Sequence, residues 1–141
     1  MEERYFSKSD DRRFKIIMVG DPNVGKTTLF WQYIEGEFLA EKSAACTTID
    51  FKIKEVKVEE EKIKIYIWDT AGQEKYRSIV ATYFKGCDGV ILMFDLTHPE
   101  SLTNSTTKWY ELAKAKAPEA HMMLVGNKSD LEVKANEKKA E

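Results

Sequence analysis

Apolar residues recur in short runs along this chain, separated by polar and charged segments. The stretch 14–19 is almost wholly apolar, 89–94 reads Gly-Val-Ile-Leu-Met-Phe, and 122–125 reads Met-Met-Leu-Val. Continuous apolar runs of this length are typical of strands that are covered on both faces, as in a parallel sheet. The pattern therefore predicts buried strands at 14–19, 89–94 and 122–125.

Two further strands are expected between the first two runs. The later one alternates apolar and other residues, and the earlier one, at 49–58, changes its apolar phase around Glu55. The segment between them, Glu59-Glu60-Glu61, is short, so the two strands are predicted to form an antiparallel hairpin, although it lacks a favourable turn residue. The apolar positions in question are Phe51, Ile53, Val56 and Val58 in the first strand, and Ile63, Ile65 and Ile67 in the second.

Helices are predicted at about 26–35, 76–85 and 99–117. Gly36 and Gly86 can end the first two, Pro99 suits the first turn of the third, and Pro118 ends it. The order of elements predicts an α/β fold: a mostly parallel sheet with one antiparallel hairpin strand and helices on both faces. A ligand is expected at the carboxyl ends of the strands.

Composition narrows the class of protein. The 141 residues are 43% hydrophobic and 33% charged, which indicates one soluble globular domain. The net charge of −2 argues against a nucleic-acid partner. Cys46 and Cys87 form no metal-like pair, no apolar run reaches membrane-spanning length, and Met1-Glu2-Glu3-Arg4 is not a secretory signal. A cytoplasmic location is therefore expected, with no membrane anchor in this chain.

The segment between the first strand and the first helix carries the strongest chemical signal. It fits G-x-x-x-x-G-K-[ST], the phosphate-binding P-loop, in the strand–loop–helix context that the motif requires. Backbone N–H groups there and the helix dipole favour an anion, Lys26 can reach phosphates, and the Thr27 hydroxyl can ligate Mg²⁺. Pro22 lacks an N–H, so one potential donor is lost. The predicted binding residues are Gly20, Asp21, Pro22, Asn23, Val24, Gly25, Lys26, Thr27 and Thr28.

Two other motifs also follow predicted strands. The sequence Asp69-Thr70-Ala71-Gly72-Gln73 comes after the second hairpin strand, and Asn127-Lys128-Ser129-Asp130 comes after the strand at 122–125. Since carboxyl ends of parallel strands share one edge of a sheet, three motifs are predicted to converge at one rim.

With these motifs the chain resembles a small GTPase of the Ras superfamily, and most closely its Rab branch, over about residues 13–131. The Rab-like features are the stretches 49–51, 68–74, 83–86 and 108–109. The resemblance implies a P-loop G-domain fold that binds GTP or GDP with Mg²⁺. It implies that Thr27 and Asp69 hold the metal, that Gly72 senses the γ-phosphate, and that Gln73 orients the attacking water.

The resemblance also implies a guanine site. Asn127, Lys128 and Asp130 match its N-K-x-D motif, in which a carboxylate accepts hydrogen bonds from guanine N1–H and the exocyclic amine. Adenine offers no such pair of donors. Phe38 lies at the spacing where the family places an aromatic ring against the base, although simple packing is the other interpretation.

Partners follow from the same resemblance. Phe51, Trp68 and Tyr83 would form an aromatic patch that reports the nucleotide state to effectors; the alternative is that they are ordinary core aromatics. No arginine is placed to stabilise the transition state in cis, so slow intrinsic hydrolysis and a GAP are expected, beside an exchange factor. The nucleotide would order residues 39–48 and 70–80.

The chain departs from the family pattern in two further places. Cys46 stands at the switch-loop threonine position, and Thr47 follows it. Either the switch is weakened or Thr47 shifts into the site. The family's last strand, guanine-contact loop, final helix and prenylated tail are also absent from these 141 residues. The expected organisation is an arm at 1–13, a shortened G-domain at 14–131 and a polar tail at 132–141, with marginal stability.

Two functions from different classes remain open at this point. One is a working GTPase switch. The other is a G-domain-like interaction module that binds nucleotide weakly without hydrolysis, and an ATP-binding P-loop protein is a weaker third. Gln73 favours the first, whereas Cys46 and the missing segments favour the second.

Overall fold

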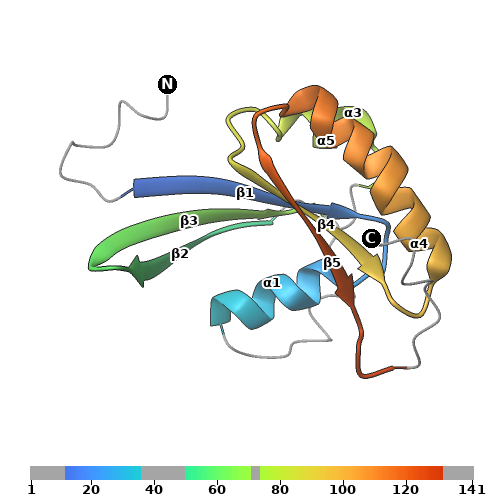
Figure 1. Ribbon diagram of the computed structural model, residues 1–141, viewed down its shortest axis with the longest axis horizontal. Helices are drawn as coiled ribbons and strands as arrows, with labels where there is room; N and C mark the ends of the chain where they lie inside the picture. The colour runs from blue at the N-terminus through green and yellow to red at the C-terminus, as the bar shows by residue number, and fades with distance from the viewer. Residues whose placement is uncertain (1–11, 36–49, 71–73, 132–141) are drawn as a thin grey trace.

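The computed structural model describes residues 12–35, 50–70 and 74–131. A twisted sheet lies at the centre of this described part (Figure 1), with the strand order β2-β3-β1-β4-β5. Pairings of β1 with β3, β1 with β4, and β4 with β5 are parallel, and only the β2–β3 pairing among them is antiparallel. This arrangement confirms the predicted α/β class and the hairpin. The strands are β1 (Arg12–Gly20), β2 (Asp50–Val58), β3 (Glu61–Asp69), β4 (Gly89–Asp95) and β5 (His121–Asn127).

Helices cover both faces of the sheet, as predicted. Alternate residues of β1 point to opposite faces, so Met18 packs with Phe30 of α1, whereas Ile17 and Val19 pack with Phe84 and other residues of the opposite layer. Figure 1 shows α1 on one side of the sheet, and α3, α4 and α5 on the other. The helices are α1 (Lys26–Glu35), α3 (Arg77–Thr82), α4 (Pro99–Asn104) and α5 (Tyr110–Lys116).

The boundaries differ from the predictions in informative ways. The strand β1 begins at Arg12, two residues before the predicted start, because its first residues pair with β3 from Ile63 onward. The helix α3 ends at Thr82, short of the predicted end, and the chain reaches Gly86 through turns.

The predicted helix at 99–117 contains a feature that its sequence pattern does not indicate. A π-helical segment, Ser105–Trp109, joins α4 to α5, and the backbone at the two junctions keeps right-handed helical angles. Pro99 occupies the first turn, and the helical run ends before Pro118, as predicted. Single π turns inside helices are rare and are often found at functional sites.

The expected change of apolar phase in β2 is confirmed, and it occurs without a bulge. Its pairing with β3 runs without interruption from Asp50 to Val58, so no bulge shifts the register. Phe51 therefore faces the α3 side, where its ring contacts Trp68, while Val56 and Val58 face the α1 side. The first half of this edge strand contributes apolar side chains to one face of the sheet, and the second half contributes them to the other. The apolar positions change phase for that reason.

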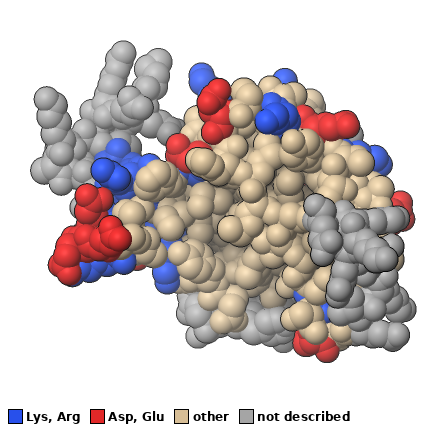
Figure 2. Space-filling model, in the orientation of Figure 1, with Lys and Arg blue, Asp and Glu red and all other residues tan. Residues whose placement is uncertain are grey.

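An apolar hollow of about 330 Å³ remains on the α1 side, lined by residues of β1, β2 and β3 that include Phe14, Ile16, Val56 and Ile63. In Figure 2 the charged side chains gather around the β2–β3 turn and along the rim of the molecule, and the middle of that view is uncharged. No helix within the described ranges is long and apolar enough to cross a membrane.

Candidate nucleotide-binding site

The loop between β1 and α1 is shaped by two glycines that allow close approaches. A side chain at Gly20 would collide with the backbone carbonyl of Met93, and one at Gly25 would collide with the side-chain amide of Asn127. Gly25 also has a φ of +99°. Asn23 adopts a left-handed φ of 66°, which asparagine tolerates better than most residues. The P-loop glycines are therefore required by neighbouring strands as well as by the turn itself.

Lys26 is held inside this loop. Its Nζ donates to the carbonyl oxygens of Gly20 at 2.9 Å and Asp21 at 2.8 Å, and forms a 2.7 Å ion pair with Glu74. The lysine is only 2% exposed. Burial lowers the pKa of Lys26, and this outweighs the opposing effect of the Glu74 carboxylate. The ammonium group is thus a preorganised, desolvated cation at the start of α1.

The predicted metal residues lie together. The Thr27 hydroxyl donates to a carboxylate oxygen of Asp69 over 2.6 Å, and both residues are buried. A hydroxyl and a carboxylate are hard oxygen ligands, and Mg²⁺ sites commonly take one or two such protein ligands and complete their shell with water and phosphate oxygens. The donor set therefore fits Mg²⁺, with Thr27 and Asp69 as the residues that would hold it.

The motif at the end of β5, Asn127-Lys128-Ser129-Asp130 (the β5 motif), is hydrogen-bonded to the P-loop through two of its residues. Asn127 donates to the carbonyl of Val24 at 2.9 Å, and Lys128 donates to the carbonyl of Asn23 at 2.7 Å. Lys128 has a left-handed φ of 67°. These bonds place this motif at the same rim as the P-loop, and the Thr27–Asp69 bond places Asp69 there as well, as predicted. Asp130 follows on the exposed turn, with its side chain open to solvent.

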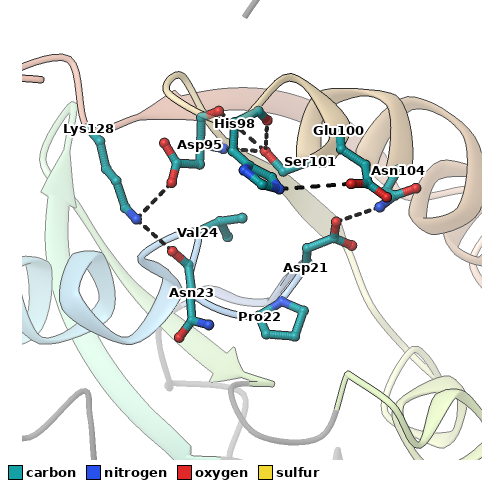
Figure 3. A pocket seen from close by; sticks show the side chains of 10 residues that line it. All are labelled: Asp21, Pro22, Asn23, Val24, Asp95, His98, Glu100, Ser101, Asn104 and Lys128. Atoms are coloured by element: carbon teal, nitrogen blue, oxygen red, sulfur yellow. Dashed lines mark hydrogen bonds and ion pairs between the residues drawn. The ribbon is translucent and has the colours of Figure 1, made fainter. Parts of the chain in front are cut away.

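A pocket of about 360 Å³ lies on the outer side of the P-loop, between it and the start of α4. Figure 3 shows Asp95 and Asn23 converging on the Nζ of Lys128, and Asn104 reaching Asp21 across the pocket wall. The Asp95–Lys128 ion pair is 2.8 Å long. The pocket rim therefore consists largely of polar groups that are already paired with one another.

The three aromatic residues proposed as a patch also lie together. The ring centroids of Phe51 and Trp68 are 4.7 Å apart, and those of Trp68 and Tyr83 are 5.2 Å apart. Phe51 is 38% exposed, and Lys15 lies over the Trp68 ring. The cluster is neither a sealed core nor a flat surface, so both interpretations of these aromatics are compatible with its geometry.

Several predicted residues lie outside the described part of the chain. These are Phe38, Cys46, Thr47, Gly72 and Gln73. The remaining predicted residues fall in the loop, in its flanks or in the two neighbouring motifs: Pro22 is exposed, Val24 is buried, and Thr28 is half-buried on α1.

Sequence reasoning missed four partners of the predicted residues: Glu74, Asp95, Asn104 and Trp109. Glu74 pairs with Lys26, Asp95 pairs with Lys128, and the Asp21 side chain accepts hydrogen bonds from Asn104 and Trp109. Glu74 directly follows the motif at 69–73, and Asp95 ends β4, so their positions in the chain were the only available signals. Which residue each of them meets depends on how the strands are ordered.

The fold and the three motifs together define an α/β domain of the P-loop class. The model of the Ras family matches residues 15–141. The chain is 42% identical over 130 residues to the Ras-related protein SEC4 of Saccharomyces cerevisiae, covering 90% of this chain and 59% of that protein. It is 43% identical over 125 residues to Ras-related protein Rab-3C of Bos taurus, covering 86% of this chain and 53% of that protein.

A third relative, Ras-related protein Rab-3A of Homo sapiens, is 41% identical over 123 residues, with 86% of this chain and 55% of that protein covered. The chain belongs to the Ras family, in its Rab-like branch. It spans somewhat more than half the length of the curated relatives that it matches.

Proposed function

We propose that this chain is a Rab-like molecular switch that binds GTP and GDP with Mg²⁺ and hydrolyses GTP slowly. The observation that supports this most is the meeting of three motifs at one rim: Lys26 and Thr27 from the P-loop, Asp69 from β3, and Asn127 bonded to Val24. By resemblance to its branch, the switch would act in membrane traffic through effectors, an exchange factor and a GAP.

In this proposal each group of residues has a separate role in binding phosphate, holding Mg²⁺ or hydrolysing GTP. Lys26 and the loop N–H groups bind the phosphates, and the buried setting strengthens each contact. Thr27 and Asp69 would hold Mg²⁺, which neutralises phosphate charge when bound. Gln73 orients the attacking water, and an arginine from a GAP supplies the remaining charge stabilisation.

Base selection is assigned to the β5 motif. Asn127 braces the P-loop through its bond to Val24, and Lys128 bonds to Asn23 and packs beside the base. Asp130 then reads the two guanine donors, while Phe38 covers the other side of the ring. This assignment distinguishes guanine from adenine by hydrogen bonding alone.

The first test measures the affinity of the purified chain for GDP, GTP, ATP and xanthosine diphosphate. Guanine nucleotides should bind far more tightly than ATP, and Asp130→Asn should weaken GDP while favouring the xanthine nucleotide, whose C2 carbonyl replaces the amine. The matched control is Glu119→Gln, an exposed acid before the amino end of β5, at the opposite edge of the sheet. Equal ATP and GTP binding would contradict the guanine assignment.

The second test separates the switch from the interaction module. Gln73→Leu should slow single-turnover GTP hydrolysis by roughly tenfold or more, without weakening GTP binding, because water orientation is lost while the phosphate contacts stay. If the rate is unchanged in a chain that binds GTP, the result would indicate an interaction module, in which hydrolysis is weak or absent.

A further inference from the structure

The second residue of the P-loop, Asp21, is tied by its side chain to the helical run on the far side of β4. One carboxylate oxygen accepts from Trp109 Nε1–H at 2.9 Å, and the other accepts from Asn104 Nδ2–H at 2.6 Å. An ionised carboxylate only accepts hydrogen bonds, and the indole nitrogen only donates, so the three groups are matched. These contacts join positions 83 and 88 residues apart in the chain.

Both donors are set by the π-helical segment, which begins immediately after Asn104 and ends at Trp109. The segment has a second anchor at its start, where the buried Ser105 hydroxyl donates to the carbonyl of Met93 at 2.6 Å. That carbonyl also lies against Gly20, the first P-loop residue. A π turn contains one more residue than an α turn, so it changes which side chains face the sheet after it.

The backbone of Asp21 continues this connection into the phosphate site. Its carbonyl accepts from Lys26 Nζ, and Gly20 supplies the neighbouring acceptor. Trp109 is 2% exposed, so its indole N–H requires an acceptor within the protein, and the half-buried Asp21 supplies it. The path from helix to lysine therefore consists of short, directional contacts, with no long flexible side chain in it.

We propose that Asp21, Asn104 and Trp109 act as a positioning group that holds the phosphate loop in its nucleotide-binding shape. Asp21 is a positioning residue here, because its side chain points to the helix and acts on phosphate through its own backbone and Lys26. This inference rests on the proposed nucleotide-binding function. It adds that nucleotide release is governed partly from the π-helical segment.

The test compares GDP release from the wild-type chain with release from Asp21→Asn, Asn104→Ala and Trp109→Phe. Asp21→Asn replaces one carboxylate oxygen by an amide NH₂, which cannot accept a hydrogen bond from Asn104 or Trp109. One of the two bonds is therefore lost with almost no change in side-chain volume. Release of a fluorescent GDP should accelerate by roughly tenfold. The double variant of Asp21→Asn with Trp109→Phe should release no faster than the faster single variant, since both changes break one unit.

The matched control is Lys108→Ala, an exposed residue within the same π-helical segment. Release at the wild-type rate from all three variants, or equal acceleration by Lys108→Ala, would overturn the proposal. Trp109→Phe leaves a space in the core and could prevent folding. In that case the release rate of Asp21→Asn tests the proposal.

The NMR resonance of the Trp109 indole N–H supplies a second measurement, which can be made with any phosphate ligand and does not require binding of a guanine base. It should move when the wild-type chain binds GDP, and the movement should disappear in Asp21→Asn. If the wild-type chain binds no guanine nucleotide, the proposed function fails, and pyrophosphate then serves as the probe. Movement with pyrophosphate in the wild type but not in Asp21→Asn supports the positioning group, and no movement overturns it.

Discussion

The ammonium group of Lys26 lies 2.7 Å from the carboxylate of Glu74, and both side chains are buried. Lys26 is also the residue assigned to the phosphates, so Glu74 and a phosphate group would compete for the same cation. Removing one partner of a buried ion pair leaves an uncompensated charge, which is strongly destabilising.

We therefore expect Glu74→Gln to lower the stability of the nucleotide-free chain by about 3 kcal/mol. The loss should shrink when Mg²⁺ and GDP are present, because phosphate then compensates the charge. Thermal unfolding with and without nucleotide measures both values. The control is Glu61→Gln, whose ion pair with Arg12 is exposed. An equal loss in the free and loaded protein would contradict the competition.

A second prediction concerns the switch position shared by Cys46 and Thr47. A thiol is a poor ligand for Mg²⁺, which prefers oxygen at short distances. If Cys46 occupies the position, Cys46→Thr should raise the preference for GTP over GDP by roughly tenfold, and Thr47→Ala should have little effect. Affinities for GDP and a non-hydrolysable GTP analogue test this. The opposite pattern would show that Thr47 has taken the position.

The β2–β3 turn offers a gain in stability. Glu59 and Glu60 both adopt left-handed backbone angles, with φ of 47° and 71°. Two-residue hairpin turns of this kind favour Asn-Gly, because other residues pay a steric penalty there. The double substitution Glu59→Asn with Glu60→Gly should raise the free energy of unfolding by about 1–2 kcal/mol in denaturant titrations.

Charge has to be separated from backbone strain in this turn. Glu60 forms an exposed 3.4 Å ion pair with Lys57, which contributes little. Glu60→Gln removes that charge without changing the backbone preference, so it should leave stability nearly unchanged. A gain from Glu60→Gln as large as that from the double substitution would point to charge repulsion as the cause.

The last prediction concerns Asp95 and pH. Burial alone would raise the pKa of Asp95, but hydrogen bonds from Lys128 and from Thr97 outweigh it, so the pKa lies below its ordinary value of 3.8. A carboxylate whose pKa is lowered by folding stabilises the protein above its unfolded pKa and loses that contribution as pH falls through the folded value.

Asp95→Asn should therefore cost about 1–2 kcal/mol at pH 7 and progressively less below pH 3.8. Urea titrations of both proteins at pH 7 and at pH 3 test this. A difference that stays constant with pH would mean that the loss comes from packing, not from the charge.

The order and type of the elements were readable from the sequence because their signals are local. Apolar runs such as 89–94 predict buried strands, and Pro99 and Pro118 limit the helical run between β4 and β5. The contributors to the site were readable for a related reason. Asp69 and Asn127 end their strands, Lys26 follows β1, and parallel strands present their carboxyl ends at one rim. Local pattern plus one rule of sheet geometry was sufficient for that much.

Other features depended on which distant residues the sheet brings together. Trp109 meets Asp21, and Glu74 meets Lys26, through contacts between segments 88 and 48 residues apart. The sequence indicated that β2 changes its apolar phase, but its pairing with β3 decided that the register continues without a bulge. The π-helical segment likewise has two tertiary anchors, at Met93 and at Asp21. The sequence by itself determined the elements and the chemistry available at the rim, because those follow from neighbouring residues. Only the tertiary structure decided which side chains pair with one another, because these hydrogen bonds and ion pairs form between surfaces that exist only after the strands have paired.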